Sequence, residues 1–159
     1  MKICMIGSGY VGLVSGACFS ELGNNVTCVD NDLNKLSDLK KGKIPIYEPG
    51  LEELIIRNLK QKRLQFSANI SESIKKADLI YTCVGTPTKT KSNEADLKYV
   101  FQVVKDIKNN LNKYKIIVTK STVPVTTGDK IQNLLTTKNN KKLFDVISNP
   151  EFLREGEAI

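Results

Sequence analysis

The stretch that decides the fold is KICMIGSGYVG, residues 2–12. Its first part, Lys2–Ile6, is a short apolar run that predicts a buried strand, and a helical pattern begins directly after the turn that follows. Gly7, Gly9 and Gly12 have the G-x-G-x-x-G spacing. Placed between a strand and a helix, the first glycine permits a tight turn, the second lets backbone approach a pyrophosphate and the third allows close helix–strand packing. The stretch predicts a dinucleotide site.

An acidic residue completes this pattern. Asp30 ends the next predicted strand and stands 18 residues beyond Gly12, close to the spacing of about 20 residues expected for a ribose ligand. Its carboxylate can accept hydrogen bonds from both ribose hydroxyls and would repel a 2′-phosphate, so NAD is favoured over NADP. The alternative is that the glycines form an ordinary tight turn and that Asp30 only caps the following helix.

Further along the chain, short β-branched runs alternate with segments of helical periodicity, which is the pattern of a parallel sheet covered by helices. The predicted strands are Lys2–Ile6, Val26–Val29, Leu64–Phe66, Leu79–Val84, Lys115–Val118 and Phe144–Ile147. The predicted helices are Tyr10–Leu22, Asp32–Lys41, Leu51–Leu59, Ser71–Lys76, Asp96–Asn110 and Thr127–Leu135. The polar stretch Thr88–Glu94 is expected to be an exposed loop. We predict one α/β domain over residues 1–159, a Rossmann-type doubly wound and mainly parallel sheet with helices on both faces.

Three strings follow predicted strands of this sheet: Gly85-Thr86-Pro87, Ser121-Thr122-Val123-Pro124 and Asn149-Pro150-Glu151. Ligands of doubly wound folds bind outside the carboxyl ends of the strands, so these hydroxyls and this carboxylate would meet beside the cofactor. Each string taken alone could equally be only a turn that contains proline.

Composition excludes several classes of function. The formal charge is +7, but the positive residues are mostly dispersed lysines, which are typical of a solvated surface, so no nucleic-acid partner is expected. No apolar run approaches the roughly 20 residues of a membrane-spanning helix, so no membrane partner is expected either. Without histidine and with Cys4, Cys18, Cys28 and Cys83 widely spaced, no metal site is predicted. Thiols buried in a reducing compartment suggest a cytoplasmic location.

Taken together, the motifs resemble the UDP-glucose 6-dehydrogenases of the nucleotide-sugar dehydrogenase family. The resemblance covers essentially the whole chain. It rests on five strings in order, KICMIGSGYVGLVSGACFSELG, IPIYEPGLEEL, VGTPT, KSTVPVTTG and SNPEFLREG. Five ordered motifs are far more specific than a dinucleotide fingerprint alone, and Tyr47–Gly50 and Phe152–Gly156 favour the UDP-glucose branch.

The resemblance implies an oxidation in which the sugar C6 alcohol loses hydride twice, to two NAD molecules, and becomes a carboxylate. The implied cofactor-binding residues are Gly7, Gly9, Tyr10, Val11, Gly12, Asp30, Lys35, Thr86, Thr122 and Glu155. Thr122 and Glu151 would position a catalytic water, since a carboxylate can accept its proton. The implied substrate contacts are Glu151, Phe152, Leu153, Arg154 and Glu155, largely through backbone groups.

The sequence departs from the family pattern in three places. Thr126 stands where the family often has glycine, and Thr88–Glu94 lacks the usual short glycine-containing turn. By resemblance, the catalytic cysteine, its supporting lysine and asparagine, the central helix and the UDP-binding domain would all follow Ile159. We therefore expect this chain alone to bind NAD without oxidising UDP-glucose, and activity to need a complementary partner. The expected partners are UDP-glucose and a complementary C-terminal chain or a second copy in a homodimer.

Two alternatives remain open at the level of sequence. The first is a stand-alone NAD-binding module that catalyses nothing. The second is the corresponding part of an enzyme that acts on GDP-mannose or on a UDP-N-acetylhexosamine. Retention of the Glu151–Glu155 segment favours a dehydrogenase over the module, because a protein that only binds NAD has no use for substrate contacts.

Overall fold

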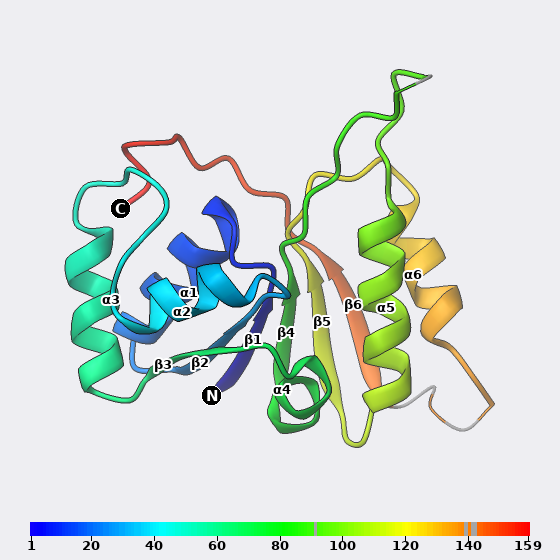
Figure 1. The fold of residues 1–159 in the computed structure, drawn as a ribbon. Helices are drawn as coiled ribbons and strands as arrows, with labels where there is room; N and C mark the ends of the chain where they lie inside the picture. Colours follow the sequence, from blue (N-terminus) through cyan, green and yellow to red (C-terminus); the bar gives the residue numbers. More distant parts are fainter. Residues whose placement is uncertain (91, 139, 141–142) are drawn as a thin grey trace.

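The computed structural model describes residues 1–90, 92–138, 140 and 143–159. Its centre is a six-stranded sheet with the strand order β3-β2-β1-β4-β5-β6, in which every pairing is parallel (Figure 1). The strands are β1 (Lys2–Ile6), β2 (Asn25–Val29), β3 (Leu64–Ser67), β4 (Leu79–Thr82), β5 (Lys115–Thr119) and β6 (Phe144–Ser148). The order reverses between β1 and β4, which is the point where ligands bind in doubly wound sheets. The predicted fold class is confirmed.

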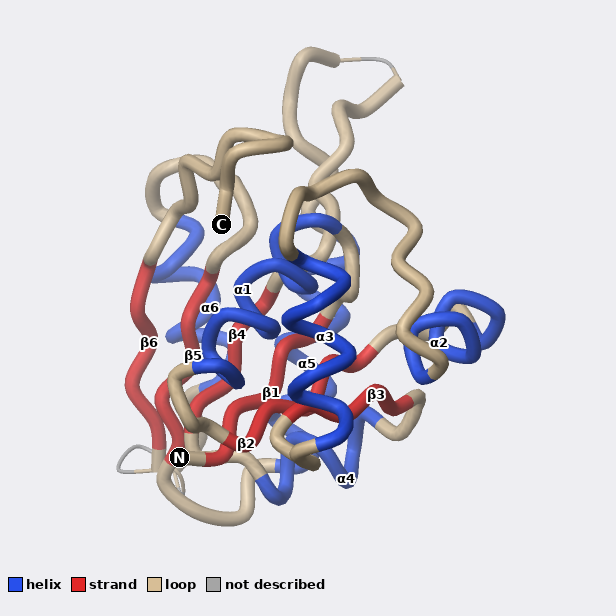
Figure 2. The backbone as a smooth tube through the Cα atoms, turned by 90° about the vertical axis from the view of Figure 1, so that its left-hand side faces the viewer, coloured by secondary structure: helices blue, strands red, loops and turns tan. Residues whose placement is uncertain are grey.

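Six helices pack on the sheet in the part of the chain that the structure describes. They are α1 (Tyr10–Glu21), α2 (Leu33–Lys40), α3 (Leu51–Lys60), α4 (Ile70–Lys76), α5 (Lys98–Asn110) and α6 (Thr127–Leu135). Figure 1 shows α1, α2 and α3 on one side of the strands and α5 and α6 on the other, and Figure 2 shows α1 and α3 in front of the strands. Residues of β1 explain why: Ile3 and Met5 point into a core shared with α1, α2 and α3, whereas Cys4 and Ile6 point into a core shared with α4, α5 and α6. Side-chain alternation along one buried strand therefore builds both layers.

Some observed helix and strand boundaries differ by one or two residues from the predicted ones. The fourth strand ends at Thr82 rather than Val84. Helix α4 begins at Ile70 instead of Ser71, because the side chain of Asn69 accepts a hydrogen bond from the Glu72 amide and so caps the first turn. Helix α5 begins at Lys98, two residues after Asp96, although the Asp96 carboxylate does accept the Lys98 amide at 3.0 Å.

The stretch Thr88–Glu94 projects beyond the sheet as an exposed excursion between β4 and α5 (Figure 1). The Lys89 ammonium lies 2.8 Å from the Glu94 carboxylate, and a bridge between Thr88 and Ala95 closes its base. The predicted exposed loop is confirmed for the residues described here; residue 91 lies outside them.

The predicted buried thiols are largely confirmed: Cys4, Cys28 and Cys83 are buried, and Cys18 is half-buried. Burial raises the pKa of Cys4 and of Cys83 to about 12, so both remain protonated thiols at neutral pH and act as small apolar groups. None of the helices described above is both long and apolar enough to cross a bilayer.

Candidate dinucleotide site

The turn between β1 and α1 is packed so tightly that two of its glycines cannot carry a side chain. Gly7 has φ +104°, and a Cβ there would lie 2.6 Å from the carbonyl oxygen of Cys83. A Cβ on Gly12 would lie 1.9 Å from the carbonyl oxygen of Gly7. The first glycine therefore allows the left-handed turn and the third allows α1 to approach it, as the spacing predicts.

Gly9 differs from its two neighbours. It has φ −75° and ψ −169°, an extended conformation open to any residue, and no atom lies within 4 Å of a Cβ built there. The structure itself therefore does not demand a glycine at this position. The space lies at the N-terminus of α1, where unpaired amides and the helix dipole favour an anion such as a pyrophosphate.

Asp30 lies beside this turn at the end of β2, held by three donors. Its Oδ2 accepts the Ser8 amide at 3.0 Å and the Lys35 ammonium at 2.8 Å, while Oδ1 accepts the Asp32 amide at 3.1 Å. Burial alone would raise the pKa of this carboxyl, but the hydrogen bonds from Lys35, Asp32 and Ser8 outweigh it and lower the pKa. Asp30 is therefore ionised at neutral pH.

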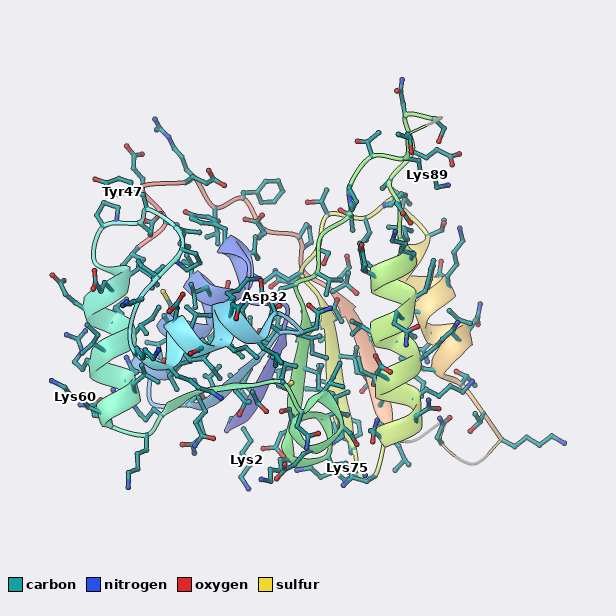
Figure 3. The ribbon with its side chains drawn as sticks, in the orientation of Figure 1. Lys2, Asp32, Tyr47, Lys60, Lys75 and Lys89 are labelled. Carbon is teal, nitrogen blue, oxygen red and sulfur yellow. The ribbon has the colours of Figure 1, made fainter. Side chains whose placement is uncertain are left out.

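The alternative role for Asp30, as the cap of the following helix, is wrong. The N-cap of α2 is Asp32, whose Oδ1 accepts the Lys35 amide at 3.0 Å. Figure 3 shows Asp32 at the start of α2, near the centre of the molecule. Asp30 is thus left to face the cavity.

A cavity of about 530 Å³ opens at this edge of the sheet. From the predicted set it is lined by Gly7, Gly9, Asp30 and Lys35, and it extends to Gly85 after β4. Residues of α5 that the sequence analysis did not single out form another wall; they are Tyr99, Gln102 and Asp106. Their three- and four-residue spacing places them on one side of α5, beside the buried valines of that helix. This polar side of α5 is the feature of the sequence from which these three lining residues could have been predicted.

The loops after β4 and β5 meet at the same edge. The Thr86 hydroxyl donates to the Thr122 carbonyl at 2.9 Å, and the Ser121 hydroxyl lies 2.7 Å from the Val84 carbonyl. The Thr122 side chain belongs to an exposed residue. The structure therefore brings two of the three predicted strand-end strings into direct contact.

The third string begins a segment, residues 149–159, that crosses the top of α1 toward the N-terminal end of α3 (Figure 1). Within it, Glu151 accepts the Leu153 amide at 2.6 Å, and Leu153 packs against the core of α1–α3. Phe152 is 93% exposed. Glu155 is exposed and lies near enough to Tyr10 for its charge to help raise the pKa of that phenol.

Glu48, on the loop before α3, holds the far end of this segment. Its Oε2 accepts the Tyr10 hydroxyl at 2.6 Å and the Gly156 amide at 2.7 Å, and its Oε1 accepts the Ala158 amide at 2.8 Å. The hydrogen bond from Tyr10 is the main cause that lowers the pKa of Glu48. Burial, followed by the same bond, raises the pKa of Tyr10 to about 12. The sequence alone identifies Tyr47–Gly50 only as a motif and does not indicate these contacts of Glu48.

The turn, the acidic residue at the end of β2 and the cavity at the reversal of strand order define the class: a dinucleotide-binding Rossmann domain. A match over residues 1–159 to the UDP-glucose/GDP-mannose dehydrogenase family, NAD binding domain, makes the assignment more particular. The chain belongs to this family as its NAD-binding domain, and NAD is its cofactor.

Relatives of known name agree with the family. The chain is 54% identical over 159 residues to the UDP-glucose 6-dehydrogenase TuaD of Bacillus subtilis, covering 99% of this chain and 34% of that protein. It is 48% identical over 159 residues to the UDP-glucose 6-dehydrogenase of Rhizobium meliloti, covering 100% of this chain and 36% of that protein. The chain therefore spans about a third of the length of the curated relatives it matches.

Solved structures give the same result. A UDP-glucose dehydrogenase from Pyrobaculum islandicum superposes with a TM-score of 0.90 at 35% identity, over 98% of this chain and 37% of that chain. A ternary complex of GDP-mannose dehydrogenase from Pseudomonas aeruginosa superposes with a TM-score of 0.91 at 34% identity, over 99% and 38% of the respective chains. Fold similarity alone therefore does not separate the two nucleotide sugars.

Proposed function

We propose that this chain is the NAD-binding part of an NAD-dependent dehydrogenase that oxidises UDP-glucose to UDP-glucuronate with two NAD+. The relatives described above at 54% and 48% identity carry the UDP-glucose 6-dehydrogenase name, which supports this choice of sugar. In this proposal residues 1–159 form the cofactor domain, and residues supplied from beyond it complete the sugar site. The cytoplasmic location stays a prediction from the sequence.

The observation that carries the proposal is the open space above Gly9, bordered by the ionised Asp30. The pyrophosphate would occupy that space against the amides at the start of α1, with Val11 beside it. The ribose hydroxyls would donate to Asp30, and Lys35 would hold that carboxylate in place. The adenine would then lie in the cavity, against the wall formed by α5. Nicotinamide chemistry supplies the hydride acceptor when the cofactor is bound.

At the other end of the cofactor, we assign Thr86, Thr122 and Glu155 to the nicotinamide and its ribose. The hydrogen bond between Thr86 and Thr122 supports this placement, because it joins the loop after β4, a strand that borders the reversal of strand order, to the loop after the neighbouring β5. Glu151 and Thr122 would position a water molecule, and the backbone of Glu151–Glu155 would contact the sugar. The Glu151 carboxylate already accepts a backbone amide, which fixes its direction.

A second candidate substrate is GDP-mannose, because the GDP-mannose dehydrogenase superposes on this chain as well as the UDP-glucose dehydrogenase does. A UDP-N-acetylhexosamine and a purely NAD-binding module are further alternatives. Oxidation of UDP-glucose by this chain mixed with the remaining C-terminal part of the Bacillus subtilis enzyme, and not by this chain alone, would support our proposal. Turnover of GDP-mannose instead, or NAD binding without any turnover, would favour the respective alternative.

A substitution at Gly9 tests the cofactor site directly. Gly9→Ala meets no atom of the protein within 4 Å and has an ordinary φ, so folding should be unchanged. The added methyl group would occupy the space assigned to the pyrophosphate, so NAD affinity measured by calorimetric titration should fall at least about tenfold, or 1.4 kcal/mol. Gly128→Ala is the matched control, since its Cβ also meets nothing within 4 Å. Equal NAD affinity in both variants would reject the assignment.

A further inference from the structure

We infer that Glu48 is a positioning residue, which fastens the segment 151–159 to Tyr10 of the glycine turn and so links the sugar side of the site to the cofactor side. The inference rests on the proposed function, because it takes residues 151–155 as the sugar-contacting segment. Glu48 itself acts only through Tyr10 and through backbone amides.

The first support is that Glu48 is a buried carboxylate satisfied by neutral donors. The residue is 4% exposed, and no Lys or Arg nitrogen of the described residues forms an ion pair with it. Carboxylates are rarely buried without a compensating partner. Here the compensation is a phenol and backbone amides that lie 108 to 111 positions later in the chain, at Gly156, Ala158 and Ile159.

The second support is that little else holds this segment. Residues 151–159 form no helix or strand. Among the described residues, the hydrogen bonds of this segment that do not involve Glu48 join two residues of the segment, with one exception. The bond from the Glu157 amide to the Arg154 carbonyl is an example of a bond within the segment. The exception again involves Tyr10, whose hydroxyl oxygen lies 3.1 Å from the Arg154 carbonyl oxygen. Packing of Leu153 and Ala158 supplies the remaining attachment.

The third support is the place of Tyr10. It directly follows Gly9, above which the pyrophosphate space opens, and it is the first residue of α1. A ligand that orders the start of α1 must also order the ring of Tyr10, and through Glu48 the segment that would contact the sugar. Cofactor occupancy and the position of residues 154–158 should therefore be linked.

The test follows cleavage of the Arg154–Glu155 bond by an arginine-specific protease, with products identified by mass. Arg57 and Arg63 are the chain's remaining arginines, and Arg57 within α3 gives an internal reference. Glu48→Gln places an amide NH₂ against groups that are themselves donors, so cleavage at Arg154 should accelerate at least about tenfold. NAD should slow cleavage at Arg154 in the unmodified chain and should lose this effect in Glu48→Gln.

Glu52→Gln is the matched control, because it removes the same charge from an exposed position four residues away. It should keep both the slow cleavage and the protection by NAD. The inference would be overturned if Glu48→Gln is cleaved at Arg154 at the rate of the unmodified chain, or if NAD protects this variant as well as it protects the unmodified chain. If Glu48→Gln unfolds, Tyr10→Phe serves instead: it removes the hydroxyl while Glu48 keeps its amide donors, so cleavage without NAD should accelerate by less than about tenfold and NAD protection should fall.

Failure of the proposed function has a different signature. In that case the chain mixed with the C-terminal part of the Bacillus subtilis enzyme oxidises no UDP-glucose, yet Glu48→Gln still accelerates cleavage at Arg154 and NAD still slows that cleavage in the unmodified chain. Failure of the inference leaves NAD binding intact, with Glu48→Gln and the Glu52→Gln control behaving alike.

Discussion

The two ends of the site are built by different means. At the end that we assign to the adenosine, here called the adenosine end and defined by the Gly7–Gly12 turn with Asp30 and Lys35, positions are fixed by buried strands and by backbone contacts too close to admit a Cβ. At the end that we assign to the nicotinamide and the sugar, here called the sugar end and defined by Thr86, Thr122 and residues 149–159, most side chains are exposed and the last residues depend on the side chain of Glu48.

This difference follows from where each end lies in the sheet. The glycine turn joins β1 to α1 in the middle of the sheet, so the two cores on either side hold it in place. The sugar end is made of loops that leave the carboxyl edge, and exposed loops have few buried contacts to fix them. The glycine turn is therefore the rigid part of the site, and residues 149–159 are the part that few contacts hold.

The largest effect should come from filling the packed turn. Gly12→Ala places a methyl carbon 1.9 Å from the Gly7 carbonyl oxygen, which forces backbone to move. We expect the free energy of unfolding to fall by about 3 kcal/mol, as at other overpacked positions, or the variant to remain unfolded. Chemical denaturation followed by circular dichroism measures it.

The matched change at the sugar end is Phe152→Ala, which truncates a side chain that is 93% exposed. Its effect on the free energy of unfolding should stay within about 0.5 kcal/mol. If both substitutions destabilise the protein equally, the distinction between a packed end and an open end does not hold.

The next effect concerns the charge of Asp30. Asp30→Asn keeps the shape of the side chain but removes its charge. Because hydrogen bonds to charged groups contribute about 1.5–3 kcal/mol, the affinity for NAD should fall at least about tenfold. The discrimination against NADP should also relax. Asp32→Asn is the control, because asparagine caps a helix as well as aspartate does. Equal affinities of the two variants for NAD would contradict the ribose assignment.

The same carboxylate sets an expectation for pH. The folded pKa of Asp30 lies below its usual value of 3.8, so the stabilisation it gives is present above pH 3.8 and is lost as pH falls through the folded pKa. Titration of Asp30 should therefore leave NAD affinity unchanged between about pH 5 and pH 9. A loss of NAD affinity near pH 6 that is absent in Asp30→Asn would show that Lys35 and the two backbone amides do not keep Asp30 ionised.

The adenosine end could be predicted from the sequence because its signals are local. Gly7, Gly12 and Asp30 lie within one strand–helix–strand unit, and each has a role that spacing alone defines. Glu48 could not be found that way, since its amide donors lie more than a hundred positions away. The burial of Lys115 could not be predicted either: it opens a strand, yet it is fully buried and donates to the Lys75 and Ala77 carbonyls at the C-terminal end of α4.

A small gain in stability should come from a substitution in the loop after β5. Thr126 precedes α6 with φ 74°, a left-handed conformation that favours glycine, and the sequence departs from the family's usual glycine at this same position. Thr126→Gly should relieve the backbone and raise the free energy of unfolding by about 0.5–1 kcal/mol after the entropic cost of glycine. For a domain of this length, the melting temperature should rise by about 1–4 °C.

Lys62→Gly provides the comparison, because Lys62 has φ 58° in the turn after α3, away from the site. If strain alone is relieved, both variants should melt at similarly raised temperatures. If Lys62→Gly is stabilised and Thr126→Gly is not, then the Thr126 side chain compensates for its own strain. The loop after β5 would in that case be held as firmly as the glycine turn, and the contrast between the two ends would be confined to residues 149–159.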